Sequence, residues 1–482
     1  MNTLNLLIFL PLLTAAVLSL PIITARAART IAVALSLVML VITLFTLSRF
    51  DPSLPIQMVT KSSWIETYGI SYHIGADPFS LIIMMVLSLI MPVTFLFIRQ
   101  EPKGILIALL IAQSGGTGAL FSLDLILFYL FWEVMLFPIF LMIGLYGSGE
   151  RVKIAIELTL YTIFGSVAMF LSILILGVQY FDLTGRFSFD LFDIARMIDA
   201  ESFRPWAFFG FLVAFFIKIP LFGFHGWLKR SYEAAPAATL IILSGVMAKL
   251  GVFALYRFVF TLFPDLSRDL APFVIALGLF GMIYFGIAAL RQEKFRSLFA
   301  YSSASHMSLI IVGLFTFNLY GQSGSIYLIT AHALATAGIF LLLERINLGG
   351  NSDSVSHYSG IIRTAPRLGV LFTLLALSFV GIPGTSGFVA ELLIIYGAFA
   401  YTPLIGFITA TTVLIAMIFI LWLLQQVLFG PSSPAAERIK DLNRVETVAM
   451  GLLVFVIFGM GIYPDPFLSA LSAAPASSGV RL

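Results

Sequence analysis

Long apolar runs separated by short polar connections extend over the whole chain. The hydrocarbon core of a bilayer is about 30 Å thick, so each helical crossing requires about 20 apolar residues. Runs of roughly this length occur 14 times, and the pattern therefore predicts 14 transmembrane helices. These runs span residues 3–22, 30–48, 78–98, 104–122, 124–146, 154–178, 206–224, 237–261, 271–290, 298–316, 323–345, 367–399, 403–429 and 445–463.

Composition supports an integral membrane protein. Apolar residues make up 60% of the chain, charged residues 11%, and the mean hydropathy is +1.05, far from the usage of soluble proteins. Residues 1–22 have no basic stretch and no small-residue cleavage site, so we expect a retained helix rather than a signal peptide. The chain has no cysteine, which excludes disulfides and Cys-ligated iron–sulfur clusters within it.

No polar connection is long enough to form a soluble domain. The longest cover residues 49–77, 179–205, 345–366 and 430–444. We therefore predict a single all-α transmembrane domain over residues 1–482. Within it, residues 1–103 hold the first three helices, 104–261 and 271–429 form two repeats, and 430–482 hold the last helix and a tail.

Two predicted helices, the seventh and the twelfth, are interrupted in a similar way. "IKIPLFGFHG" at 217–226 and "VGIPGTSGFVAE" at 380–391 combine proline and glycine within apolar runs, and their prolines lie 163 residues apart. Proline removes a helix hydrogen bond, and freed backbone groups persist at membrane depth only where protein or water covers them. Each break falls in the fourth helix of a five-helix set, 4–8 or 9–13. Because five is odd, the second set enters the membrane in the opposite sense, which indicates inverted repeats.

The distribution of basic residues predicts the orientation of these helices. With the amino terminus outside, 17 of the 27 Lys and Arg residues fall in inner connections and 8 in outer ones, while Lys218 and Lys249 lie within helices. Positive residues are enriched in inner connections. We therefore expect both termini outside, which requires an even number of helices. Basic runs such as "RQEKFR" at 291–296 are interpreted as solvated loop faces and give no indication of nucleic-acid binding.

Six ionisable residues interrupt the apolar runs. A charge at the bilayer centre costs at least about 2.5 kcal/mol, so such residues usually mark a functional path. The six are Glu133, Lys218, Lys249, His306, His332 and Glu391.

A buried lysine is informative because burial favours its neutral form, whereas a nearby carboxylate restores the protonated one. Spread over several helices, these groups predict a proton path whose occupancy responds to charge. Three alternatives stay open: snorkelling of a lysine to a helix end, a purely structural role for the glutamates, and neutral hydrogen bonding by the histidines. The histidines lack a ligand partner at i+3 or i+4, which argues against a metal site. No motif for a phosphate, haem or other cofactor is present, so we predict no cofactor in this chain.

Several stretches together resemble the antiporter-like membrane subunits of respiratory complex I, the NADH:quinone oxidoreductase, over nearly the whole chain. They are "ISYHIGADPFSL", "LILFYLFWEVMLFPIFLMIGLYG", "FFIKIPLFGFHGWL", "LSGVMAKLGVFALYRF", "FAYSSASHMSLIIVG", "ITAHALATAGIFLL" and "GIPGTSGFVAELLIIYGAF". The resemblance implies 14 helices with two inverted repeats. It also implies proton translocation by the residues that match the family positions: Glu133, Lys218, Lys249, His306, His332 and Glu391.

The chain departs from the family pattern at two places. Where the family usually reads "HxWLPDAHxEAPT", this chain reads "HGWLKRSYEAAPAAT", so that Lys229 and Arg230 replace a Pro-Asp pair. In the sixth helix, Glu157 stands where the family commonly has lysine.

The resemblance implies a proton-pumping membrane-arm subunit of a bacterial inner membrane. Its expected partners are the lipid bilayer and neighbouring antiporter-like subunits, with NADH and quinone reached only through other subunits. One rival is a homologous subunit of a multisubunit Na⁺/H⁺ antiporter or membrane-bound hydrogenase. A second rival is a stand-alone secondary transporter, although the polar groups are spread over several helices rather than gathered into a substrate site.

Overall fold

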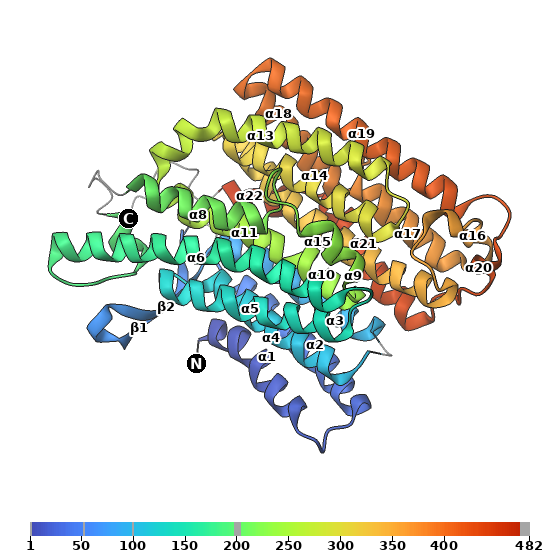
Figure 1. Cartoon of the computed structure of the whole chain (residues 1–482), viewed down its shortest axis with the longest axis horizontal. Coiled ribbons are helices and arrows are strands. Elements are labelled where there is room, and N and C mark those ends of the chain that lie inside the picture. Colours follow the sequence, from blue (N-terminus) through green and yellow to red (C-terminus); the bar gives the residue numbers. More distant parts are fainter. Residues whose placement is uncertain (1, 52–53, 99–100, 197–203, 473–482) are drawn as a thin grey trace.

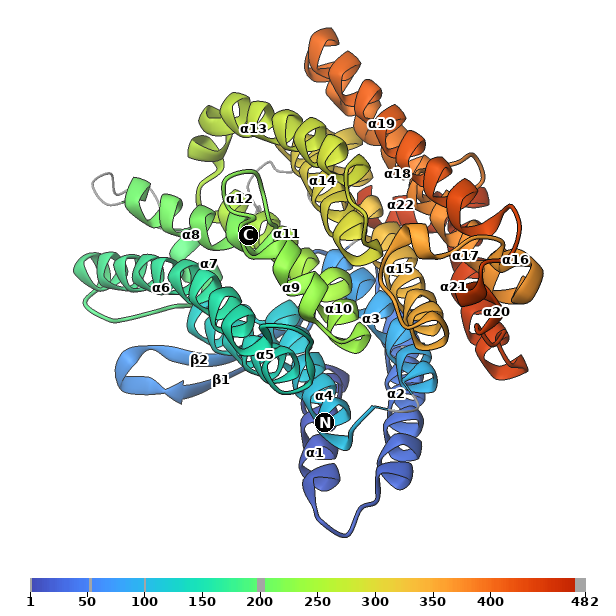
Figure 2. The same ribbon diagram turned by 45° about the vertical axis from the view of Figure 1, so that its right-hand side comes forward.

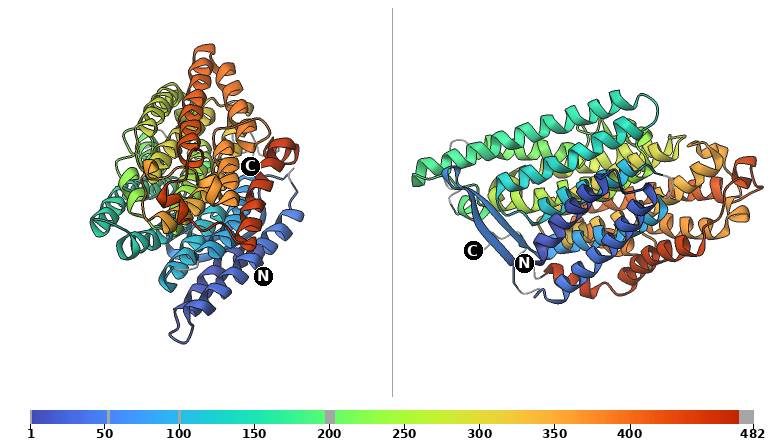
Figure 3. Two further views of the ribbon diagram at one scale, coloured as in Figure 1. Left: turned by 90° about the vertical axis from the view of Figure 1, so that its right-hand side faces the viewer. Right: turned by 90° about the horizontal axis from the view of Figure 1, so that it is seen from below.

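The computed structural model describes residues 2–51, 54–98, 101–196 and 204–472. The helices run roughly side by side in one bundle that is several helices deep (Figures 1 and 3). Eleven helices among the described residues are long and apolar enough to cross a membrane. They are α2 (Ala25–Ser48), α3 (Pro78–Phe97), α4 (Lys103–Phe121), α5 (Leu125–Tyr146), α6 (Arg151–Thr184), the continuous segment Ala237–Leu262, α13 (Pro264–Leu290), α14 (Phe295–Phe315), α15 (Leu319–Gly350), α19 (Pro403–Leu428) and α21 (Arg444–Ile462).

Three shorter apolar helices complete the picture: α1 (Thr3–Ser19), α17 (Pro366–Phe379) and α18 (Ser386–Tyr401). The prediction of a mostly helical integral membrane protein is therefore confirmed. The helices α6 and α15 extend beyond the predicted runs 154–178 and 323–345, because their last turns are too polar for the bilayer core yet stay helical. Two basic residues counted for the orientation, Arg99 and Arg481, lie outside the described residues.

A β-hairpin occupies the connection at 49–77, an element that the prediction of an all-α fold did not include. Its strands β1 (Gln57–Ile65) and β2 (Ile70–Ala76) pair antiparallel through a short turn at Glu66–Tyr68 and Gly69. The hairpin packs on the helix ends, since the Leu123 amide donates to the His73 carbonyl at 2.8 Å. We call this side of the protein, with residues 57–76 and 185–196, the hairpin face. The first and last described helices also reach it (Figure 1).

The hairpin is fixed to the next connection by a small ionic cluster. Asp190, which caps α7 (Leu191–Ala195), binds His73 Nδ1 at 2.6 Å and Lys61 Nζ at 2.7 Å. Burial alone would raise the pKa of Asp190, but the hydrogen bonds and charges of His73 and Lys61 outweigh it and lower the pKa from 3.8 to about 2. A carboxyl with a lowered pKa stabilises the fold above its unfolded pKa, and that contribution is lost as the pH falls through the folded one.

We therefore expect Asp190→Asn to loosen the hairpin at neutral pH. Backbone hydrogen exchange in residues 57–76 should rise several-fold, whereas Asp182→Asn, a change at an exposed position near the end of α6, should leave it unchanged. In the wild-type protein the same loosening should develop between about pH 4 and pH 2, after correction for intrinsic exchange. Equal hairpin protection in both variants at neutral pH would contradict the role given to Asp190.

The segment Ala237–Leu262 lies at the centre of the protein, between the α4–α5 and α14–α15 sides (Figure 2). It comprises α10 (Ala237–Ile242), α11 (Ala248–Ala254) and α12 (Phe260–Leu262), joined by two π-helical turns, η2 (Leu243–Met247) and η3 (Leu255–Val259). A π turn widens the helix and is frequent at functional sites. The two wide turns enclose α11, which carries Lys249.

Both predicted breaks are present. The first separates α8 (Arg204–Lys218) from α9 (Leu228–Ala234), and the second separates α17 from α18. Each includes a glycine with positive φ, Gly223 at 88° and Gly384 at 94°, a conformation that glycine adopts at little cost. At the first break, the Trp227 indole donates to the Ile217 carbonyl at 3.0 Å, and thus satisfies a backbone group in the last turn of α8.

Candidate functional site

The amino group of Lys249 lies at the centre of the buried polar residues. Lys249 is fully buried in α11. Its Nζ donates to the carbonyl of Ser244 in the π turn η2 and contacts His332 Nδ1 at 2.8 Å. His332 Nε2 has no hydrogen-bond partner among the described residues. The lysine can therefore exchange a proton with an imidazole that has a second, unused nitrogen.

His306 connects this pair to Glu391. The two histidine rings lie 5.3 Å apart between centroids, and Phe379 packs against both. His306 Nδ1 bonds the Ser302 carbonyl at 3.0 Å, so this nitrogen carries a hydrogen. The other nitrogen, Nε2, lies 3.4 Å from Glu391 Oε1. A favourable contact there requires one proton shared between imidazole and carboxyl.

Lys218 and Glu133 form a second group beside the first break. Lys218 is 2% exposed, and its ammonium lies over the Trp132 ring, 3.4 Å from the centroid. Such a cation–π contact stabilises a desolvated ammonium group. Glu133 follows Trp132 and is close enough to act on Lys218 electrostatically, yet no ion pair joins the two among the described residues. One carboxyl oxygen of Glu133, Oε1, is buried without a partner.

The two groups meet at α11. Gly251 packs so closely on the first break that a Cβ there would lie 2.9 Å from Ile219 and 3.4 Å from the Cβ of Lys218. Gly251 is two residues from Lys249. The structure thus brings Lys249, His332, His306 and Glu391 into one continuous row and places Lys218 and Glu133 next to it.

The second break holds the carboxylate of Glu391 in place. Gly381 has a φ of 63°, and an added Cβ would come within 2.3 Å of Glu391 Oε2. We expect Gly381→Ala to displace the carboxylate from His306 and to lower proton translocation at least about tenfold, within the range a positioned proton-transfer group contributes. Gly459→Ala in α21, where a Cβ meets open space, is the matched control. Proton uptake by proteoliposomes measures the effect, and equal activity of the two variants would contradict it.

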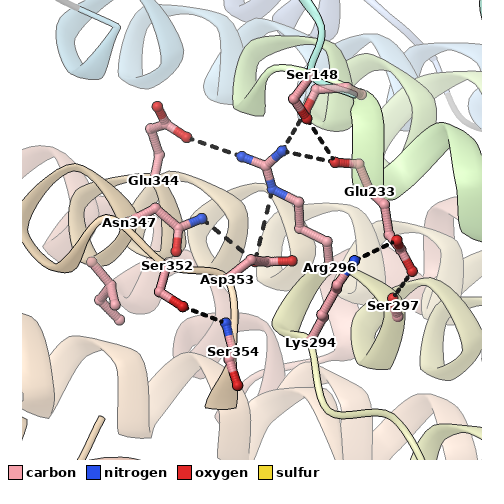
Figure 4. Close-up of polar contacts among 12 residues, drawn as sticks. Ser148, Glu233, Lys294, Arg296, Ser297, Glu344, Asn347, Ser352, Asp353 and Ser354 are labelled. Carbon is pink, nitrogen blue, oxygen red and sulfur yellow. Dashed lines mark hydrogen bonds and ion pairs between the residues drawn. The ribbon is translucent and has the colours of Figure 1, made fainter. Parts of the chain in front are cut away.

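The side of the protein opposite the hairpin, which we call the basic face, carries an ionic network (Figure 4). Arg296 at the start of α14 binds Glu344 at 3.5 Å and Asp353 at 3.9 Å, and donates to the carbonyl of Glu233 at 3.3 Å. The Glu233 carboxylate binds Lys294 at 2.8 Å and thereby raises the pKa of that lysine. These contacts hold the short helix α9 against α14.

The two departures from the family pattern contact each other. Arg230 in α9 binds Glu157 in α6 at 3.0 Å, and both side chains are partly exposed. An exposed pair contributes at most about 1 kcal/mol, so its main effect is to position α9.

Sequence reasoning missed several groups of the site. Trp132 appears in the sequence as one more apolar residue, and Ser244 acts through its backbone carbonyl, which no side-chain pattern reveals. Within the described residues, no group of three or more His, Cys, Asp or Glu side chains is placed to hold a metal ion.

The chain is similar in sequence and structure to known membrane proteins. The family model described as "NADH:quinone oxidoreductase/Mrp antiporter, TM" matches residues 122–417. The NADH-quinone oxidoreductase subunit M of Rickettsia conorii is 32% identical over 450 residues, which covers 92% of this chain and 90% of that protein. A chain of the respiratory complex I from Thermus thermophilus with bound NADH superposes with a TM-score of 0.89 at 27% identity, over 98% of both chains. A chain of the Mrp complex from Dietzia sp. gives a TM-score of 0.86 at 22% identity, over 99% of this chain and 97% of that one.

Proposed function

Because the chain belongs to the family of antiporter-like membrane subunits shared by NADH:quinone oxidoreductase and the Mrp antiporters, we propose that it is the M-type subunit of a respiratory complex I. It translocates protons while quinone is reduced in neighbouring subunits. The single observation that carries this function is the row of Lys249, His332, His306 and Glu391. Each member can gain or lose a proton, and each contacts or stacks near the next.

The geometry suggests how the row works. Lys249 can pass its proton to His332 only while the imidazole of His332 is neutral, because two adjacent cations in a desolvated site repel strongly. Protonation of His306 is favoured by the Glu391 carboxylate at 3.4 Å. When Lys249 becomes protonated, its positive charge repels a proton held by the histidines. That proton therefore moves along the row towards Glu391. Lys218 and Glu133 supply a second charge beside Lys249, which alters its tendency to keep a proton.

Finer features of the fold belong to the same proposal. The eleven long helices, α1, the pair α8 and α9 taken as one broken helix, and the pair α17 and α18 taken as another would together give 14 crossings. The two broken helices would occupy equivalent places in inverted repeats at 104–261 and 271–429. The basic face would lie inside a bacterial inner membrane, with the hairpin face and both termini outside.

The chain would act as a subunit of an enzyme complex without a redox group of its own. Its expected partners are adjacent membrane-arm subunits and lipid, and NADH and quinone would react in other subunits. We propose no cofactor for it.

A subunit of an Mrp-type antiporter is the main rival, because that likeness extends over the whole fold. A likeness at 22% identity supports the fold alone, whereas the 32% identical relative is named as a subunit of NADH-quinone oxidoreductase. A complex purified through a tag on this chain should contain flavin and iron–sulfur subunits and should pump protons when NADH reduces quinone. Co-purification of membrane subunits alone, with Na⁺/H⁺ exchange, would favour the antiporter.

A further inference from the structure

The hydroxyl of Tyr232 lies beside the site but has no part in the mechanism above. Tyr232 belongs to α9 and is 2% exposed, with its ring packed edge-on against Phe340 at 5.8 Å between centroids. Its hydroxyl is within hydrogen-bonding reach of the hydroxyls of Ser244 and Ser303. Those two hydroxyls, from η2 and α14, are 3.4 Å apart. Three separate segments thus bring together a buried group, which we call the hydroxyl cluster (Tyr232, Ser244, Ser303).

The hydroxyl cluster borders the ammonium group of Lys249. Ser244 belongs to both arrangements, because its side chain is part of the cluster while its backbone carbonyl accepts from Lys249 Nζ. The site therefore has polar neighbours on two sides: His332 from α15, and the cluster from α9, η2 and α14.

The helix that carries Tyr232 lies at the basic face. The next residue, Glu233, is part of the ionic network with Lys294 and Ser297 (Figure 4). The side chain of Lys229 in the same short helix is 44% exposed. The backbone of Tyr232 therefore lies in a short helix at the solvated side of the protein. Its hydroxyl lies beside Ser244 and Ser303, next to the buried Lys249.

Hydroxyl groups suit the transfer of protons in such a place. A hydroxyl oxygen accepts an incoming proton as its own proton passes to the next acceptor, so each member ends with the charge it began with. Ser231, Thr239 and Ser302 add buried hydroxyls without a partner among the described residues. They lie in α9, α10 and α14, and buried polar groups of this kind commonly bind internal water. The segments that form or adjoin the cluster therefore carry further buried hydroxyls.

We propose that Tyr232, together with Ser244 and Ser303, passes protons between Lys249 and the basic face, and that Tyr232 is a proton-relay residue of this chain. The inference rests on the proposed function, because it takes Lys249 as the group that exchanges the proton. No oxidant, reductant or other reactant is needed, since only protons move.

Tyr232→Phe removes the hydroxyl and keeps the ring that packs on Phe340. In the whole complex, reconstituted into proteoliposomes, this variant should translocate protons about tenfold more slowly, the modest end of what a positioned proton-transfer group contributes. The rate should also become more sensitive to replacement of H₂O by D₂O. Tyr327→Phe is the matched control, because Tyr327 is equally buried but its hydroxyl donates to the Met460 carbonyl at 2.7 Å, away from the cluster. It should keep wild-type translocation.

Two further variants separate a relay from packing. Tyr232→His returns a group that exchanges protons and should recover part of the rate, which a structural role for the ring would not explain. Ser303→Ala should reduce translocation as much as Tyr232→Phe does. If a native gel shows that Tyr232→Phe does not assemble, the translocation rate of Ser303→Ala tests the relay by itself. Wild-type translocation in both Tyr232→Phe and Ser303→Ala, with Lys249→Ala defective, would overturn the inference and leave the proposed function standing. Normal pumping by Lys249→Ala would overturn both.

Discussion

Lys249→Ala should assemble into its complex and yet lose most of its coupled proton translocation, at least about tenfold, because a positioned proton-transfer group commonly accounts for a hundredfold or more of a step. The amino group of Lys249 contacts His332 Nδ1 at 2.8 Å and donates to the carbonyl of Ser244 in the π turn, so it joins the row to η2. Its removal leaves His332 without a proton donor. Lys249→Arg should also be impaired, because a guanidinium group keeps its proton at any physiological pH.

Leu250→Ala is the control for the cavity that the alanine creates. Leu250 is the next residue of α11 and is equally buried, but its side chain carries no proton. Proteoliposomes with the purified complex give both quantities: NADH oxidation for electron transfer and the pH gradient for translocation. A Lys249→Ala variant with normal electron transfer and a normal pH gradient would refute the central place given to this lysine.

Glu133→Gln and Lys218→Met should each slow turnover strongly, for opposite reasons. The first leaves the buried ammonium of Lys218 with Trp132 but without the nearby carboxylate. The second leaves the half-buried carboxylate of Glu133, whose Oε1 has no partner among the described residues, without the charge of the lysine. In the part of the chain that the structure describes, no ion pair joins the two groups, so the loss should be smaller than the roughly 3–5 kcal/mol that breaking a buried ion pair costs. Because the two charges act on each other, their effects should not add, and the double variant should be no worse than the more severe single one.

A double-mutant cycle on proton-coupled oxidoreductase activity in membranes tests this coupling, with assembly checked on a native gel. Glu150→Gln provides the matched control, since Glu150 pairs with Lys153 at an exposed site and should be almost neutral. Strict additivity of the two defects, or wild-type activity in Glu133→Gln, would show that Glu133 is a packing partner only.

The class of fold and the candidate residues could both be predicted from the sequence, and the same physical reason accounts for both. A bilayer core requires long apolar runs, so each ionisable residue within a run, such as Lys249, is conspicuous. The breaks at Pro220 and Pro383 were equally visible, because proline and glycine disturb a helix wherever they occur. The roles of the six residues in proton transfer stay predictions.

The contacts of the site needed the structure. The pairing of His306 with Glu391 joins α14 to α18, and nothing in either helix's own sequence fixes that approach. The hairpin at 57–76 was missed because its strands mix polar and apolar residues between two strongly apolar runs, so they read as part of a polar connection. Tyr232 was missed because a buried tyrosine at a helix interface is common, and only its interaction with the side chains of Ser244 and Ser303 sets it apart.

The wide turn η2 has a consequence for the direction in which Lys249 points. Successive residues of an α-helix are rotated by about 100° around its axis. A π turn accommodates an additional residue, so every position after Leu243–Met247 is rotated relative to an uninterrupted helix. Lys249 follows that turn by two residues and meets His332 in its rotated position. The angular phase of α11 is thus set by η2, and a helical wheel drawn from the sequence alone misplaces Lys249 by about 100° relative to α10.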